Sequence, residues 1–291
     1  MKKLTLIYSI LCLLLGLYSC QKMDRPVLGD YPKDVDVIPT TPLRFFVPFD
    51  STETKDRQLN IRFADEISSY PCLFPDASIK SGVGVSGTSY QGADNVALRY
   101  LNANDMKTAT SFTVALWMKQ TVAEANGRTQ FLFSFVDETY DWAKSAIFMM
   151  VEHATLTDAT VKVLVMDQWL EFANANNVDN KLKKPMFDGN WHHWVMAYDE
   201  VTSKMIYYFD GVRIDNPPAA ATDVKKDGSA RGKLDLTKAT SLVIGGYNRH
   251  GGAPGTTDDW MKSFTGGLDQ FRMYNKVLSA AEVKELYDGK K

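Results

Sequence analysis

Apolar and polar residues alternate in short runs along most of the chain. The clearest run is SFTVALWMK, residues 111–119, in which Phe112, Val114, Leu116 and Met118 recur at every second position. A period of two places these four side chains on one face of a β-strand. The residues between them are less apolar, so we expect one face to pack on a core and the other to be partly covered.

Similar runs, rich in β-branched and aromatic residues, follow one another from residue 44 onward with turn-forming residues between them. They are RFFVPFD (44–50), NIRFA (60–64), NVALRYL (95–101), TQFLFSFV (129–136), AIFMMVE (146–152), TVKVLVM (160–166), HHWVMAYD (192–199), KMIYYFD (204–210), SLVIGG (241–246) and LDQFRMY (268–274). Many strands without alternating helices predict a two-sheet antiparallel β-sandwich. No internal linker interrupts residues 44–291, which we interpret as one domain.

One helix is clearly indicated, at the end of the chain. Ser279 followed by Glu282 forms a capping-box pattern, and Leu278 and Val283 have the spacing of a hydrophobic staple across that cap. Gly289 is a typical helix stop. We therefore predict a short C-terminal helix.

The first residues indicate export. Lys2 and Lys3 precede an uncharged, leucine-rich run over residues 4–17, which is shorter than the about 20 residues that span a bilayer. The run ends in Leu-Tyr-Ser-Cys at residues 17–20, which resembles a bacterial lipobox. The resemblance implies a signal peptide over residues 1–19 and a lipid on Cys20. The alternative is an ordinary signal peptide with an incidental cysteine.

Residues 20–43 are predicted to be a lipidated, proline-rich tether that acts as a semi-rigid spacer and holds the domain off a membrane. Only Cys72 lies in the domain itself, so no disulfide forms within it. The formal net charge of −2 and the absence of a basic stripe argue against nucleic acid as a partner. The expected location is the outer membrane, on the cell surface or on the periplasmic face.

Three segments resemble the laminin-G-like, concanavalin A-like jelly-roll family: residues 111–119, NWHHWVMAYDEVTSKMIYYFDGVRID at 190–215, and FTGGLDQFRMYNKVLSAAEVKELYDG at 264–289. That family implies two packed sheets and a groove or loop rim that often binds carbohydrate. Its members also include adhesion modules and appendages of enzymes. The tether resembles those of Bacteroides-type lipoproteins, which accompany glycan-uptake proteins.

A glycosidase of related fold needs two facing carboxylates, and the E-x-D-x-x-E pattern of one such branch is missing. Glu138 and Asp141 are three apart, so they would point to opposite faces of a strand. Neighbouring His192 and His193 are likewise unsuited to share one metal ion. We expect a protein that is not an enzyme, with a divergent glycoside hydrolase as an alternative.

The family resemblance also implies a structural calcium ion. Asp269 stands where related proteins often place a calcium ligand, and Asp50 could reach the same site because the first and last strands of such sandwiches are close. Calcium prefers oxygen ligands. The alternative is that Asp269 only hydrogen-bonds a turn.

A sugar site needs an aromatic face and polar groups for the hydroxyls. The loop YNRHGGAPGTTDDW, residues 247–260, supplies both kinds of group, and two other tryptophans lie at strand ends or in loops. The candidate ligand-binding residues are Trp260, Asp258, Asp259, Arg249, His250 and Asn248 in this loop, and Trp169 and Trp142 elsewhere. We expect a glycan or polysaccharide as ligand. The alternatives are a plain surface loop and a protein-interaction module.

Overall fold

The computed structural model describes residues 39–50, 63–73, 76–138, 145–172, 180–256 and 258–290, which belong to one compact unit, Val37–Lys291. Cys20 and Trp142 lie outside the described residues. Within the described ranges, no helix is both long enough and apolar enough to cross a membrane.

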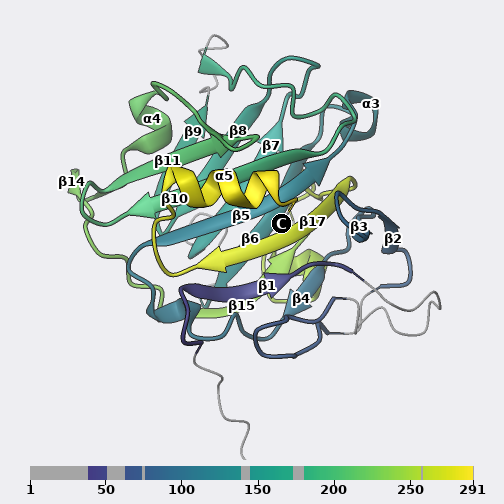
Figure 1. Ribbon diagram of the computed structural model, residues 1–291, viewed down its shortest axis with the longest axis horizontal. Coiled ribbons are helices and arrows are strands. Elements are labelled where there is room, and N and C mark those ends of the chain that lie inside the picture. The colour runs from purple at the N-terminus through teal and green to yellow at the C-terminus, as the bar shows by residue number, and fades with distance from the viewer. Residues whose placement is uncertain are drawn as a thin grey trace, which may run out of the picture. The chain divides into compact units, whose positions relative to one another are not determined.

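Two sheets form a β-sandwich, as the sequence predicted. The first is an eight-stranded antiparallel sheet with α5 (Ala280–Asp288) on its outer face (Figure 1). Its strands, in spatial order, are β12 (Val212–Arg213), β11 (Lys204–Phe209), β10 (His192–Asp199), β5 (Phe112–Lys119), β17 (Gly267–Tyr274), β3 (Thr88–Gln91) and β2 (Lys80–Val83), with β1 (Leu43–Val47) also paired to β17.

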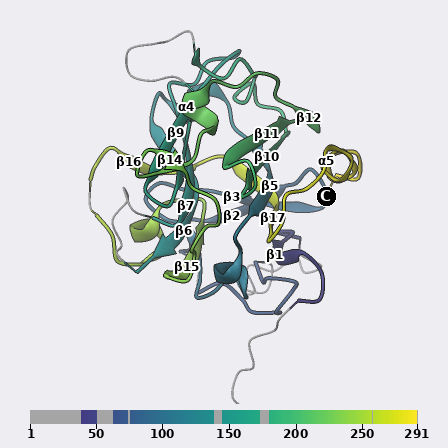
Figure 2. The same ribbon diagram turned by 90° about the vertical axis from the view of Figure 1, so that its left-hand side faces the viewer.

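The second sheet has seven strands, and its layer is separated from the first in Figure 2. Its order is β4 (Leu98–Tyr100), β15 (Ala239–Ile244), β6 (Thr129–Asp137), β7 (Ile147–Glu152), β8 (Thr160–Val165) and β9 (Gln168–Phe172), with β16 (Met261–Ser263) parallel to β6. The remaining elements are the hairpin β13 (Lys225–Lys226) and β14 (Ser229–Ala230) and the short helices η2 (Met106–Thr108), α3 (Val122–Ala125), α4 (Ala219–Thr222) and η5 (Asn248–Gly251).

The predicted alternation of β5 is confirmed. Its four apolar positions, from Phe112 to Met118, lie in the core between the sheets. On the other face, Ala115 belongs to a buried cluster with Val283 of α5 and with Leu278, which precedes that helix. The ring of Trp117 stacks on that of Tyr287, with centroids 5.5 Å apart. The second face is therefore covered by the C-terminal helix.

The C-terminal helix begins as predicted. The side chain of Ser279 accepts a hydrogen bond from the Glu282 amide, and the Glu282 carboxylate accepts one from the Ser279 amide at 2.8 Å. Asp210 and Gly211 form the hairpin turn between β11 and β12, and both have positive φ, 51° and 75°. Gly289 ends the helix in right-handed conformation, with φ of −78°.

Two sequence interpretations are corrected. Phe63 and Ala64, the described end of the predicted strand at 60–64, lie outside any strand, although Phe63 is fully buried. Phe63 thus belongs to the core although its backbone is irregular. Residues 88–91 are absent from the predicted strands, but Thr88–Gln91 is strand β3, which pairs with both β2 and β17.

Candidate functional site

The loop between β15 and β16 begins with two buried side chains. Asn248 is fully buried, and its Oδ1 accepts a hydrogen bond from the Ser134 hydroxyl at 3.0 Å. His250 is also buried, and its Nδ1 accepts the amide of Tyr247 at 3.0 Å. Burial lowers the pKa of His250 to about 4, so the ring is neutral at physiological pH. The structure thus places Asn248 and His250 inside the loop, where they shape it.

Arg249 joins the two ends of this loop. Its Nη2 donates to the carbonyl oxygens of Asp258 and Met261, at 2.8 and 3.0 Å. Among the described residues of the loop, the exposed ones are Gly252, Pro254, Asp258, Asp259 and Trp260. The side of Trp260 that is covered packs against the sheet, and 41% of the residue is open to solvent. These exposed residues are the ones that a ligand can reach.

Trp260 begins a row of aromatic rings on the outer face of the seven-stranded sheet. Its ring centroid is 6.1 Å from that of Phe131, which is 5.1 Å from Phe148, which in turn is 5.9 Å from Trp169. Tyr247 packs against both phenylalanines. We call these five residues the outer aromatic row. It connects Trp260 to Trp169, the two described tryptophan candidates.

A bulge in β6 creates this row. Strict alternation would put Phe131 and Phe133 on the same face, but the pairing with β7 shifts between these two residues. As a result, Leu132 and Phe133 both lie in the main core, whereas Phe131 packs with Phe148 on the outer face. A β-bulge re-aims side chains in this way.

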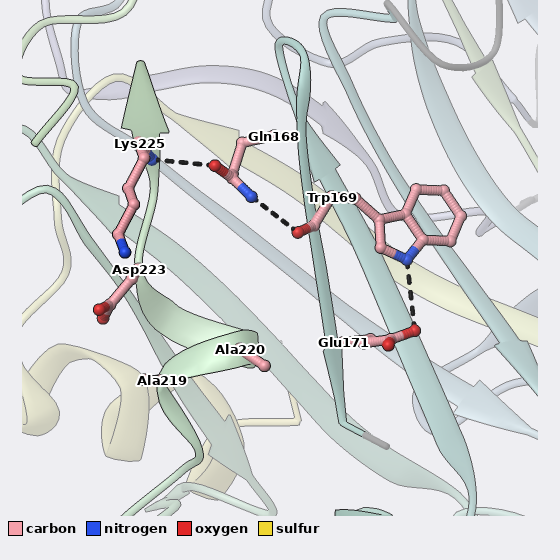
Figure 3. A pocket seen from close by; sticks show the side chains of 7 residues that line it. All are labelled: Gln168, Trp169, Glu171, Ala219, Ala220, Asp223 and Lys225. Carbon is pink, nitrogen blue, oxygen red and sulfur yellow. Dashed lines mark hydrogen bonds between the residues drawn. The ribbon is translucent and has the colours of Figure 1, made fainter. Parts of the chain in front are cut away.

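The far end of the row borders a pocket of about 320 Å³ (Figure 3). The indole Nε1 of Trp169 donates to the Glu171 carboxylate at 3.3 Å. The ammonium of Lys162 lies 5.6 Å from the Trp169 ring centroid. The pocket is lined by Gln168, Trp169, Glu171, Ala219, Ala220, Asp223 and Lys225. It therefore combines an aromatic side chain with hydrogen-bonding groups of both kinds.

Glu171 and Asp223 are the two carboxylates that line this pocket, and their contacts indicate whether they suit a catalytic role. Asp223 accepts a hydrogen bond from the Lys204 ammonium at 2.6 Å, which lowers the pKa of the carboxyl. Glu171 is engaged by the Trp169 indole. A glycosidase needs one carboxyl group that a raised pKa keeps protonated. The pKa of Asp223 is lowered, so its carboxyl group is ionised instead. In the earlier acidic cluster, Glu138 pairs with Lys238 at 3.0 Å, and Asp141 lies outside the described residues.

The two predicted calcium ligands face the same turn, between β2 and β3. Asp269 is fully buried, and its Oδ2 accepts the Val85 amide at 2.8 Å. Asp50 accepts the Thr88 amide at 2.9 Å. Gly87, with φ of +59°, leaves room for Asp50, because a Cβ there would be 1.9 Å from a carboxylate oxygen. Both carboxylates thus accept backbone amides of the same turn. These contacts also fit the alternative that Asp269 hydrogen-bonds a turn, and the calcium role stays a prediction.

The chemistry of this turn fits a cation. A Cβ on Gly84 would meet three oxygens within 2.8 Å: Asp269 Oδ2 and the carbonyl oxygens of Ser86 and Thr88. Burial, reinforced by the charge of Asp50, raises the pKa of Asp269 to about 7, although backbone amides oppose the shift. Among the described residues, no three His, Cys, Asp or Glu side chains form a metal-binding group, so backbone carbonyls would have to supply most ligands.

The two neighbouring histidines point in different directions. His192 Nδ1 is 2.9 Å from Asp210 and its Nε2 is 3.1 Å from Asp188. Burial opposes protonation, but these carboxylates outweigh it and raise the pKa of His192. His193 packs against Trp117 on the helix-covered face, and burial lowers its pKa to about 3. The two rings occupy separate environments, as the strand geometry predicted.

The sequence analysis missed the polar residues around Trp169. Strand β9 was not predicted, and QWLEF does not alternate strictly because Trp169 and Leu170 are both apolar. A period of two places Trp169 and Glu171 on one face of the strand and the buried Leu170 and Phe172 on the other. Asp223 and Lys225 come from a segment distant in sequence, around α4, and no local pattern connects them to Trp169.

Residues 91–284 match the family model described as the concanavalin A-like lectin/glucanases superfamily, a laminin G model. No curated protein matches the chain. Among solved structures, a similar one is domain 4 of AbnA, a GH43 extracellular arabinanase from Geobacillus stearothermophilus, in complex with arabinotriose. It has a TM-score of 0.50 and 13% identity over 84% of this chain and 98% of that one.

Two toxin domains are also similar. The receptor binding domain of botulinum neurotoxin C/D mosaic serotype has a TM-score of 0.54 and 9% identity over 86% of this chain. The binding domain of Paraclostridial Mosquitocidal Protein 1 has a TM-score of 0.52 and 10% identity over 85% of this chain. The aligned part spans 51% and 52% of those two chains, about half of each. At these identities the likeness is one of fold.

Proposed function

Because the chain belongs to the concanavalin A-like lectin/glucanases superfamily, we propose that it is a carbohydrate-binding protein without catalytic activity, which captures a polysaccharide at the cell surface. The observation that carries this proposal is the outer aromatic row, which ends in an exposed tryptophan on one side and in a polar-lined pocket on the other. We assign the ligand to this face of the seven-stranded sheet.

The two ends of the row, Trp260 and Trp169, suit a sugar chain, whereas Phe131, Phe148 and Tyr247 between them are fully buried and support the end rings. Apolar C–H faces of sugar rings stack on aromatic side chains, and hydroxyl groups need both donors and acceptors. Asp258 and Asp259 flank Trp260, while Glu171, Asp223 and Lys225 line the pocket at Trp169. One structural neighbour, the arabinanase domain, holds an oligosaccharide, arabinotriose. We expect affinities in the millimolar to micromolar range, about −4 to −8 kcal/mol.

The proposal includes a lipid anchor at Cys20, supported by the leucine-rich run and the lipobox-like residues before it. We expect Cys20→Ser to abolish labelling by radioactive palmitate in bacteria, and to release the protein from the membrane fraction. A full-length variant that still labels and sediments with membranes would contradict the anchor. Neighbouring glycan-uptake proteins in the outer membrane are the proposed partners.

A structural calcium ion at Asp269 and Asp50 is part of the same proposal. The converging oxygens of Asp269, Ser86 and Thr88 support it. When bound, the ion would neutralise the two neighbouring carboxylates. The site lies in the β2–β3 turn and on the eight-stranded sheet, so we propose a structural role for the ion and no direct contact with the sugar.

A glycan array tests the proposed function. The unit Val37–Lys291, which is compact by itself, is applied with calcium or with a chelator. We expect binding to one class of polysaccharide, and no release of reducing ends from it. Failure to bind any glycan would overturn the proposal and favour a protein-interaction module. Release of reducing ends that a Glu171→Gln variant abolishes would instead indicate a glycoside hydrolase.

A further inference from the structure

We infer that a second pocket, at the edge of the sandwich, binds the carboxylate of a uronic acid. The pocket has a volume of about 440 Å³ and shares no residue with the outer aromatic row. It is lined by Phe172, Val212, Ile214, Pro217 and Pro218, by the run from Asn180 to Lys184, and by Arg213, Asp215 and Asn216. This inference goes beyond the proposed function, because it concerns a different site and a charged ligand.

The pocket lies where the edge strands of both sheets end. β9 is the last strand of the seven-stranded sheet, and β12 is the last strand of the eight-stranded sheet. The turn at Asp210 and Gly211 leads into β12, and so brings Arg213 to this edge. The segment 180–184 joins from the other side, with Leu182 bridged to Ala159. Three separate parts of the chain thus form the pocket.

Apolar residues form part of the lining. Phe172 and Leu182 are both 3% exposed and belong to the main core. Pro217, Pro218 and Ile214 are partly exposed. The three partly exposed residues can contact the C–H face of a sugar ring, whereas Phe172 and Leu182 are buried. A fully hydrated inorganic ion would gain nothing from this apolar lining.

The charged residues of the lining are mainly basic, although the whole chain has a formal net charge of −2. Four cations, Lys181, Lys183, Lys184 and Arg213, face a single acid, Asp215. Local concentration of one charge in an otherwise balanced protein raises the local concentration of the opposite ion. The pocket therefore favours an anionic ligand over a neutral one.

Two of these cations already have a partner, and two are available. Lys181 and Lys183 lie 3.4 and 4.0 Å from the Asp158 carboxylate. Neither Lys184 nor Arg213 forms an ion pair within the part of the chain that the structure describes. The ammonium of Lys184 instead lies 5.8 Å from the Phe209 ring centroid. Arg213 is exposed, and its guanidinium has the geometry to hold a carboxylate through two hydrogen bonds.

The basic pocket adjoins the pocket at Trp169. Glu171 lines the Trp169 pocket and the next residue, Phe172, lines the basic one. In the same way, Ala219 lines the first and Pro218 the second. The two pockets therefore lie on either side of the contact between β9 and α4. A polysaccharide with acidic units could occupy both, but the basic pocket is able to bind a uronate without the outer row.

Titration calorimetry with two matched tetrasaccharides tests the inference. The probes are tetragalacturonate and its methyl ester, which has the same sugars without the charge. At low salt we expect the acid to bind at least about tenfold more tightly than the ester, because charge-assisted hydrogen bonds are lost with the charge. The preference should shrink as salt screens it.

Substitutions inside and outside the pocket show which residues cause the preference for the acid. Arg213→Gln with Lys184→Ala should remove the preference for the acid, whereas Lys107→Ala, an exposed lysine outside the pocket, should preserve it. Equal binding of acid and ester, no binding of either, or a preference that survives the double variant would overturn the inference. The same variants are assayed against the polysaccharide from the array. Loss of that binding only in Trp260→Ala would separate the two sites.

Discussion

Replacing Trp260 with alanine is expected to weaken polysaccharide binding by about 30-fold, which corresponds to roughly 2 kcal/mol. The exposed ring of Trp260 is held in place by Phe131, at 6.1 Å between centroids. An aromatic side chain that is already ordered loses little entropy when a sugar stacks on it. Titration calorimetry with the array-identified polysaccharide measures the effect.

Two further variants serve as controls for Trp260→Ala. Trp260→Phe keeps an aromatic face and should retain most of the affinity. Val201→Ala removes an exposed apolar side chain in the turn between β10 and β11, on the other sheet, and should leave binding unchanged. Melting temperatures should be near wild type in all three, since 41% of Trp260 is already in solvent. Wild-type affinity in Trp260→Ala would remove this residue from the site.

The second large effect concerns Asp269 and pH. In the presence of a chelator, we expect the contribution of Asp269 to the free energy of unfolding to fall as the pH rises from about 4 to about 7. Buried, neutral His193 and His250 contribute in the opposite direction, so the wild type is compared with Asp269→Asn at each pH. The folded protein holds a proton on Asp269 up to a pKa of about 7, whereas the unfolded chain releases it near the usual value for Asp. More protons bound in the folded state means that stability declines with rising pH. The expected loss is on the order of 3 kcal/mol.

Chemical denaturation at several pH values, repeated with Asp269→Asn, measures this dependence. The amide cannot ionise, so this part of the slope should vanish in the variant. Asp50 and Arg272, which interact electrostatically with Asp269, remain in both proteins. Adding calcium at pH 8 should raise the stability of the wild type and not of Asp269→Asn. If the stability of the wild type minus that of Asp269→Asn is flat or rises over this range, the burial argument is contradicted.

The sequence predicted the features that depend on local patterns. The alternation of β5 correctly separated its core face from its helix-covered face, and the spacing of Ser279 and Glu282 correctly located the start of α5. Local patterns could not predict that Asp50 and Asp269 contact the same turn, because one residue follows the first strand and the other lies in the last. The resemblance to a known family supplied that information.

The outer aromatic row could not be predicted from the sequence. In TQFLFSFV, Phe131 and Phe133 are two residues apart and look equivalent, but a bulge in the pairing with β7 separates them. A bulge depends on the partner strand, which is distant in the chain.

The burial of the predicted ligands Asn248 and His250 could not be predicted from the sequence either. Their side chains hold the backbone of the loop and the adjacent strand.

The affinity of the double variant Trp169→Ala/Trp260→Ala for the array-identified polysaccharide tests the central claim most directly. The outer aromatic row has its two accessible ends at these residues, so their joint removal should leave no measurable binding in a protein that still folds. Circular dichroism and the melting temperature establish the folding. A folded double variant that binds with wild-type affinity would show that the glycan is held elsewhere, and would contradict the assignment of the site to this face.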